Sequence, residues 1–198
     1  VVVTMTRAKE KQIRSMQSDL TVRDEDQDKW IEGRFVVFNQ PTELWPGAFE
    51  EVDPNAFDEC MGNDVRALIN HDTTLVLGRV KAGTLILRIE SDGLWGRVKI
   101  NPNDTDALNI YERVKRGDVS GCSFGFNIEE EETNYNDDGT IKWVLKKVDL
   151  HEVSVCTFPA YEETGVQARK VEVAQHAKRQ LEQRKNNLKE RLKTCLNS

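Results

Sequence analysis

The chain has few of the residues that build metal sites or disulfide frameworks. Its 198 residues include only four cysteines and three histidines. The cysteines form no C-x-x-C pair, so their spacing fits neither a zinc site nor a disulfide framework; they are Cys60, Cys122, Cys156 and Cys195. We therefore expect reduced thiols, no metal and no cofactor.

Long hydrophobic runs and an excess of positive charge are also missing. No segment approaches the ~20 apolar residues that a membrane helix needs, and the opening "VVVTM" is too short for a signal sequence. The formal net charge of −6 argues against a nucleic-acid surface that covers the whole molecule. These absences predict a soluble intracellular protein with no membrane or nucleic-acid partner.

The apolar segments that are present are short and rich in β-branched and aromatic residues. They predict strands at 30–39, 64–72, 119–132 and 143–158, and two consecutive hairpins within 77–100. A helix is predicted before Gly117, because Asn, Asp and Thr precede an apolar face at helical spacing and a basic last turn follows it. The expected fold class is β-rich α+β, a mostly antiparallel sheet or barrel with few helices.

The ends of the chain differ in composition from its centre. Residues 1–22 are polar and of mixed charge, which predicts a flexible leader before a core domain at 23–166. Residues 167–198 predict a basic helical tail with a narrow apolar stripe: Ala174, Ala177, Leu181, Leu188, Leu192 and Cys195. The stripe is broken at Arg184 and Lys185. The helix either docks on a partner, self-associates weakly, or is simply solvated.

Residues 121–125, "GCSFG", match the G-x-S-x-G pattern of the α/β-hydrolase nucleophile elbow around Ser123. An elbow requires a helix directly after the serine. Here "FNIEEEETNYNDDG" follows, a strand end and a turn without an apolar helical face. The sequence therefore argues against an α/β-hydrolase esterase and leaves Ser123 as a strand residue or a nucleophile of another fold.

An activated serine needs an imidazole and a group that orients it. His71 ends an apolar strand in "RALINHD", and Glu152 lies within the apolar strand "VDLHEVSVC". Strand alternation predicts that Leu150 and Glu152 share one face and that His151 lies on the other. A buried carboxylate requires a partner, and an imidazole would supply it. The alternatives are a structural or surface histidine and an edge-strand glutamate that faces water.

Four segments together resemble the prohead (capsid maturation) serine proteases of tailed bacteriophages: "VRALINHD", "LGRVKAGTLIL", "RGDVSGCSFGF" and "LHEVSVCTFPAY". The resemblance extends from Trp30 to Thr164 and depends on the order of these motifs. That family is regarded as distantly related to the herpesvirus assembly proteases. The resemblance therefore implies a β-barrel wrapped by a few helices.

The resemblance also implies roles for individual residues. Ser123 matches the nucleophile, His71 the general base, and Glu152 the position of the residue that orients the base. His151 is the alternative for the third role, because the herpesvirus relatives use a second histidine. Cys122 is a rival nucleophile, but as the strand neighbour of Ser123 it points to the opposite face.

The implied function is a serine endopeptidase that acts inside the assembling prohead in the host cytoplasm. Its implied substrates are the scaffold, or the scaffolding segment of the major capsid protein, and the protease itself. Self-association is a further expectation from the herpesvirus relatives. The alternative is a non-catalytic assembly factor with the same barrel, which binds capsid protein or scaffold without cleaving it.

Overall fold

The computed structural model describes residues 2–5, 11–18, 20–136, 138–158 and 163–196. The chain divides into two compact units, Val1–Tyr161 and Glu162–Ser198. The first unit contains every strand found among the described residues, and the second contains helix α2 (Glu163–Leu196). Neither helix in the described part of the chain has the length and hydropathy that a membrane span requires.

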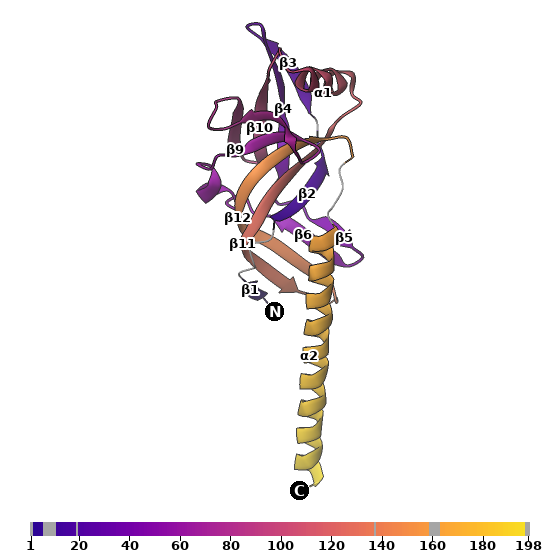
Figure 1. Cartoon of the computed structure of the whole chain (residues 1–198). Coiled ribbons are helices and arrows are strands. Elements are labelled where there is room, and N and C mark those ends of the chain that lie inside the picture. Colours follow the sequence, from indigo (N-terminus) through magenta and orange to yellow (C-terminus); the bar gives the residue numbers. More distant parts are fainter. Residues whose placement is uncertain (1, 6–10, 19, 137, 159–162, 197–198) are drawn as a thin grey trace. The chain divides into compact units, whose positions relative to one another are not determined.

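The described strands form two sheets (Figure 1). The larger sheet contains β1 (Val2–Met5), β2 (Lys11–Gln17), β5 (Thr42–Trp45), β6 (Ala48–Val52), β7 (Arg66–Ile69), β8 (Asp72–Arg79), β11 (Gly121–Tyr135) and β12 (Ile141–Cys156). The smaller has the order β3 (Thr21–Glu25), β4 (Asp28–Val37), β10 (Gly93–Ile100) and β9 (Leu85–Glu90). Most pairs are antiparallel, whereas β12 runs parallel to β6 and β7. The β-rich prediction is confirmed; the pairings among described residues do not close into a barrel.

Strands β11 and β12 form a long hairpin that positions the candidate site (Figure 1). One face of each strand enters the hydrophobic core, as the alternation of buried apolar side chains shows. The core residues here are Cys122, Phe124 and Phe126 on β11, and Val153 and Val155 on β12. The intervening residues, which include Ser123 and Glu152, therefore share the opposite face.

A bulge interrupts this alternation at His151. Gly125 pairs with Glu152, but the next residue, Phe126, pairs with Leu150, so one residue of β12 is skipped. Leu150 consequently joins the core at 1% exposure. The prediction that Leu150 and Glu152 share a face was wrong, because a β-bulge shifts the register by one residue and reverses every side chain beyond it.

Two further expectations differ from the structure. Residues 77–100 form one predicted hairpin, β9–β10, but β8 pairs with β7 across a tight turn at Asn70 and His71. The expected flexible leader contains strands: β2 pairs with β11, and β3 pairs with β4. Strand β2 was missed because its partner β11 lies far along the chain and leaves no local signal, whereas β3 pairs with the next strand, β4, across a two-residue turn.

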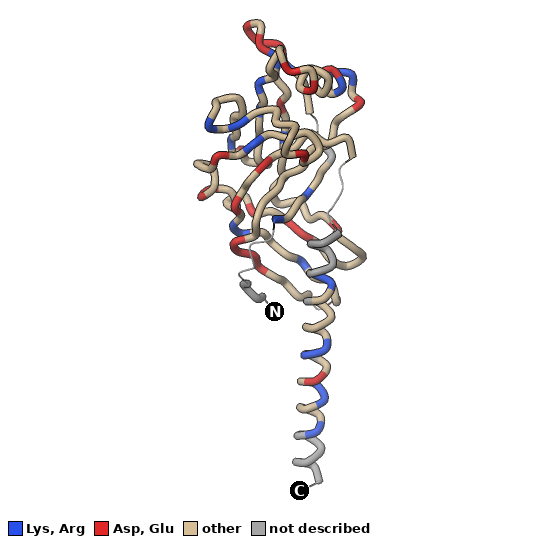
Figure 2. The backbone as a smooth tube through the Cα atoms, viewed as in Figure 1, with Lys and Arg blue, Asp and Glu red and all other residues tan. Residues whose placement is uncertain are grey.

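Helix α1 begins and ends where the sequence indicates. This helix (Thr105–Arg116) is capped by Asp104, whose side chain accepts hydrogen bonds from the backbone of Asp106 and Ala107. It ends at Gly117, which adopts the left-handed conformation with φ of 85°. A short 3₁₀ helix spans Asp58–Cys60. Acidic and basic residues are interspersed along the chain of the first unit (Figure 2).

Helix α2 carries exposed leucines. Leu181 and Leu188 are 54% and 53% exposed. The side chains of Leu192 and Cys195, which belong to the predicted apolar stripe, lie outside the described residues. The predicted boundary between a core domain and a tail at residue 167 stays a prediction, as does the function of the helix.

Candidate active site

His71 lies in a two-residue turn between β7 and β8. Ile69 pairs with Asp72 across this turn, and Asn70 and His71 have φ values of 48° and 62°. A hairpin turn with positive φ at both central residues favours asparagine at the first and glycine at the second. Histidine at the second position is therefore strained, and such strain is concentrated at functional sites.

Asn70 hydrogen-bonds this turn to the end of β12. Its backbone N–H donates to the carbonyl of Val155 at 3.0 Å, and its side-chain oxygen accepts from the N–H of Thr157 at 2.9 Å. These bonds fix the turn against the strand that carries Glu152. His71 is thereby held beside a residue far away in the sequence.

Glu152 is the hydrogen-bond partner of the imidazole. Nδ1 of His71 lies 2.7 Å from Oε1 of Glu152, and Nζ of Lys11 lies 3.2 Å from the same oxygen. Burial alone would raise the pKa of Glu152, but bonds from His71 and Ser154 and the charges of His71 and Lys11 hold it below its ordinary value. The carboxylate is therefore ionised at neutral pH, although only 3% of the residue is exposed.

Gly125 makes room for this carboxylate. It pairs directly with Glu152 across the β11–β12 ladder. A Cβ atom at this position would lie 2.3 Å from Oε1 of Glu152 and 2.7 Å from Cε of Lys11. Only glycine avoids these contacts, so the close approach of β11 to the carboxylate depends on it.

Ser123 lies on the same face of the sheet, one strand away from the pair. It is opposite Ser154 in the ladder and is fully buried. Its hydroxyl donates to the backbone carbonyl of Arg14 on β2, at 2.7 Å. The structure thus brings His71 and Glu152 together, and it places Ser123 on the same face, opposite Ser154, with its hydroxyl directed toward β2.

The rival residues occupy other positions. Cys122 points into the core and donates to the carbonyl of Arg34, and burial raises the pKa of its thiol to about 12. His151 lies at the bulge, with Nε2 3.9 Å from Asp149. Cys156 is 3.7 Å from Nε2 of His71, but burial and the charge of Glu152 raise its pKa to about 12. It is therefore a neutral thiol.

Sequence reasoning missed three residues around the site: Lys11, Arg14 and Ser154. Lys11 and Arg14 belong to β2, where mixed charge suggested a leader. The guanidinium of Arg14 is nevertheless buried, because Glu50 on β6 binds it through two bonds of 2.5 and 3.0 Å. That partner is 36 residues away, so no local pattern indicates it.

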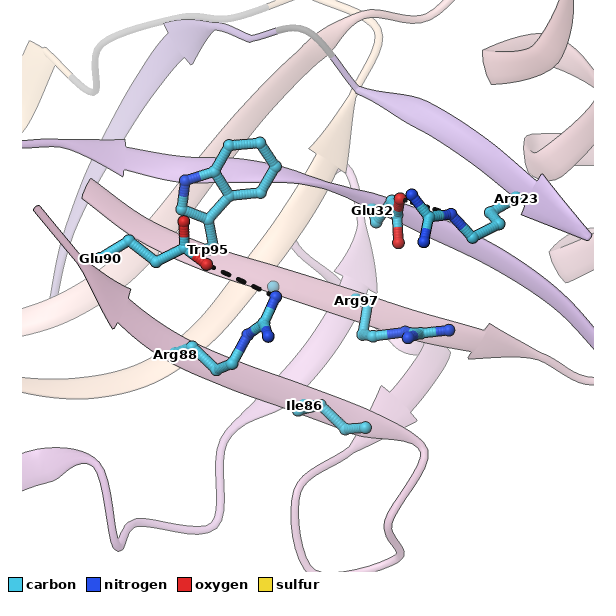
Figure 3. Close-up of a pocket in the computed structure, with 8 residues that line it drawn as sticks. Arg23, Glu32, Ile86, Arg88, Glu90, Trp95 and Arg97 are labelled. Carbon is cyan, nitrogen blue, oxygen red and sulfur yellow. Dashed lines mark ion pairs between the residues drawn. The ribbon is translucent and has the colours of Figure 1, made fainter. Parts of the chain in front are cut away.

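A separate pocket of about 350 Å³ lies on the smaller sheet (Figure 3). Its arginines are paired with glutamates: Arg23 with Glu32, Arg88 with Glu90, and Arg97 with Glu25. None of the predicted catalytic residues lines it. These ion pairs balance the charge of the arginines, and His71 is not among the lining residues.

Comparisons with known proteins agree with the motifs. The profile of the family described as Caudovirus prohead serine protease matches residues 18–179. The prohead protease of Enterobacteria phage HK97 is 31% identical over 122 residues, which are 59% of this chain and 51% of that protein. The chain thus spans about half the length of this relative. The structure of the bacteriophage T4 capsid assembly protease superposes with a TM-score of 0.53 at 11% identity, over 77% of this chain and all of that one.

Proposed function

Because this chain belongs to the Caudovirus prohead serine protease family, we propose that it is a serine endopeptidase of capsid maturation. Ser123 is the proposed nucleophile, His71 the general base and Glu152 the residue that orients the base. The observation that carries the proposal is the 2.7 Å contact between His71 Nδ1 and Glu152 Oε1, on the sheet face that also holds Ser123.

The contact determines which imidazole nitrogen reacts. An ionised carboxylate accepts hydrogen bonds only, so Glu152 keeps the proton on Nδ1 and leaves Nε2 unprotonated, with the Cys156 thiol 3.7 Å away in the described conformation. Nε2 is then the atom that takes a proton from a nucleophile. The negative charge of Glu152 also stabilises the imidazolium that forms during the reaction.

In the proposed reaction, the hydroxyl of Ser123 leaves the carbonyl of Arg14 as the chain around it opens, and turns about χ1 toward Nε2 of His71. Its oxygen then attacks the scissile carbonyl while Nε2 takes the proton. The same proton passes to the leaving amine, and a water molecule hydrolyses the acyl-enzyme by the reverse route. No step needs a cofactor.

The described conformation is a resting state in this proposal. Ser123 is fully buried and its hydroxyl is held by β2, so a peptide reaches it only after the surrounding chain opens. The proposed substrates are the scaffold or the scaffolding segment of the major capsid protein, and the protease itself. The proposed place of action is the assembling prohead in the host cell. Self-association belongs to the same proposal.

Co-expression with the major capsid protein of the same phage tests the function. Wild type, Ser123→Ala and His71→Ala are compared by intact mass, with Ser120→Ala as the matched control. Ser120 is an exposed serine three positions away. We expect processing in wild type and Ser120→Ala, and unprocessed chains in the other two variants.

The same experiment decides between the protease and the non-catalytic assembly factor. An assembly factor would bind the capsid protein and show no cleavage in any variant. Processing that persists in Ser123→Ala would contradict the proposed nucleophile directly.

A further inference from the structure

Ser154 contacts both residues of the His71–Glu152 pair. Its hydroxyl donates to Oε2 of Glu152 at 2.8 Å and accepts the backbone N–H of His71 at 3.2 Å. Ser154 is fully buried on β12, two residues from Glu152 and directly opposite Ser123. It therefore lies opposite the proposed nucleophile in the ladder and contacts the proposed base directly.

The two bonds have a defined direction. The carboxylate of Glu152 is ionised and has no hydrogen to give, so the single hydrogen of the Ser154 hydroxyl must point to it. The oxygen of Ser154 is then free to accept the N–H of His71. One hydroxyl therefore satisfies both contacts without an alternative arrangement.

The hydrogen bond from Ser154 engages the second oxygen of the Glu152 carboxylate. Oε1 receives His71 and Lys11, and Oε2 receives Ser154. With both oxygens engaged, the plane of the carboxylate cannot rotate away from the imidazole. Bonds to a buried charged group are worth more than bonds between neutral groups.

The second hydrogen bond of Ser154 is made with the backbone N–H of His71, the proposed base. His71 has a φ of 62°, which a residue with a side chain adopts only under restraint. Asn70 holds the first half of the turn, and Ser154 holds the N–H of His71 itself. The strained backbone is therefore fixed on the side that faces Glu152.

We propose that Ser154 is a positioning residue. It links the carboxylate of Glu152 to the backbone of His71 and so fixes the position of the carboxylate relative to the base. The inference rests on the proposed function for its catalytic meaning. It goes further in assigning a fourth residue, which touches neither substrate nor reacting atoms. A purely structural serine would contribute to stability and leave the imidazole unaffected.

The test compares Ser154→Ala with Ser154→Thr, which keeps the hydroxyl, and Ser154→Cys, which keeps the volume. Thr133→Val is the matched control, because Thr133 is a buried residue of the same sheet ten positions along β11 from Ser123. NMR of ¹⁵N-histidine-labelled protein records the Nδ1 proton of His71, assigned by its loss in His71→Ala. Capsid processing in co-expression gives the rate.

We expect the alanine and cysteine variants to lose or broaden the Nδ1 signal and to process about 10- to 100-fold more slowly, since one bond to a charged group is lost. The threonine variant and Thr133→Val should keep both the Nδ1 signal and the wild-type processing rate. A folded Ser154→Ala protein with an unchanged Nδ1 signal and rate would overturn the inference. If wild type shows no processing, the proposed function fails instead, and the NMR comparison still decides the part of Ser154.

Discussion

Nδ1 of His71 and Oε1 of Glu152 lie 2.7 Å apart, although 81 positions of sequence separate the two residues. Three local features bring them together: a hairpin turn that presents the imidazole, a parallel β7–β12 ladder that brings the turn to β12, and a glycine that admits the carboxylate. The turn and the glycine each lead to a separate prediction.

Because the turn strains the backbone of His71, we predict that this histidine serves function and does not contribute to stability. His71→Gly and His71→Ala both remove the imidazole, but only glycine adopts a positive φ without steric cost. We expect His71→Gly to be more stable than His71→Ala by about 1 kcal/mol. Urea denaturation measures the difference, and both variants should be inactive. Equal stabilities would show that the turn relaxes in the variants.

Because no room is left for a side chain at Gly125, we predict that the Gly125→Ala substitution disrupts the site. Gly125→Ala would place a Cβ atom against the carboxylate of Glu152, at a distance that requires displacement. We expect loss of processing and a destabilisation of about 1–3 kcal/mol. Gly62→Ala is the control, because no atom lies within 4 Å of the added Cβ there. A Gly125→Ala protein as active as the control would contradict the packing described.

Cys122 should be dispensable for catalysis. Its thiol lies on the core face, away from Ser123, and its pKa of about 12 keeps it protonated. We expect Cys122→Ala to process the capsid protein at the wild-type rate, with a loss of stability of about 1 kcal/mol from the removed buried sulfur. Inactivity of a stably folded Cys122→Ala protein would revive the thiol as a nucleophile.

The sequence predicted the strand-rich class, helix α1 and the likeness of its motifs to one family. It also indicated Glu152, because an ionisable group in an apolar strand needs a partner. The bulge at His151 was not predictable, since it is defined by pairing with β11 and not by the composition of β12. Strand β2 was missed for a similar reason: the charge of Arg14 is neutralised by Glu50 on another strand.

The pKa of Glu152 predicts how stability changes with pH. It lies below the ordinary value of 4.5 in the folded protein. The ionised carboxylate therefore stabilises the fold at pH values above 4.5, and this contribution is lost as the pH falls through the lower folded pKa. Wild type should exceed Glu152→Gln in unfolding free energy at pH 6, and the difference should shrink toward pH 3. Denaturation curves that give a constant difference across this range would contradict the ionised pair.

The nucleophile is tested most directly by mapping a fluorophosphonate adduct. The probe reacts with an activated serine hydroxyl, with loss of fluoride, and peptide mass spectrometry locates the modified residue. Performed on protein co-expressed with its capsid protein, the measurement should find the adduct on Ser123 in wild type and none in His71→Ala. An adduct on a different residue, or undiminished processing by protein whose Ser123 is fully modified, would contradict the account.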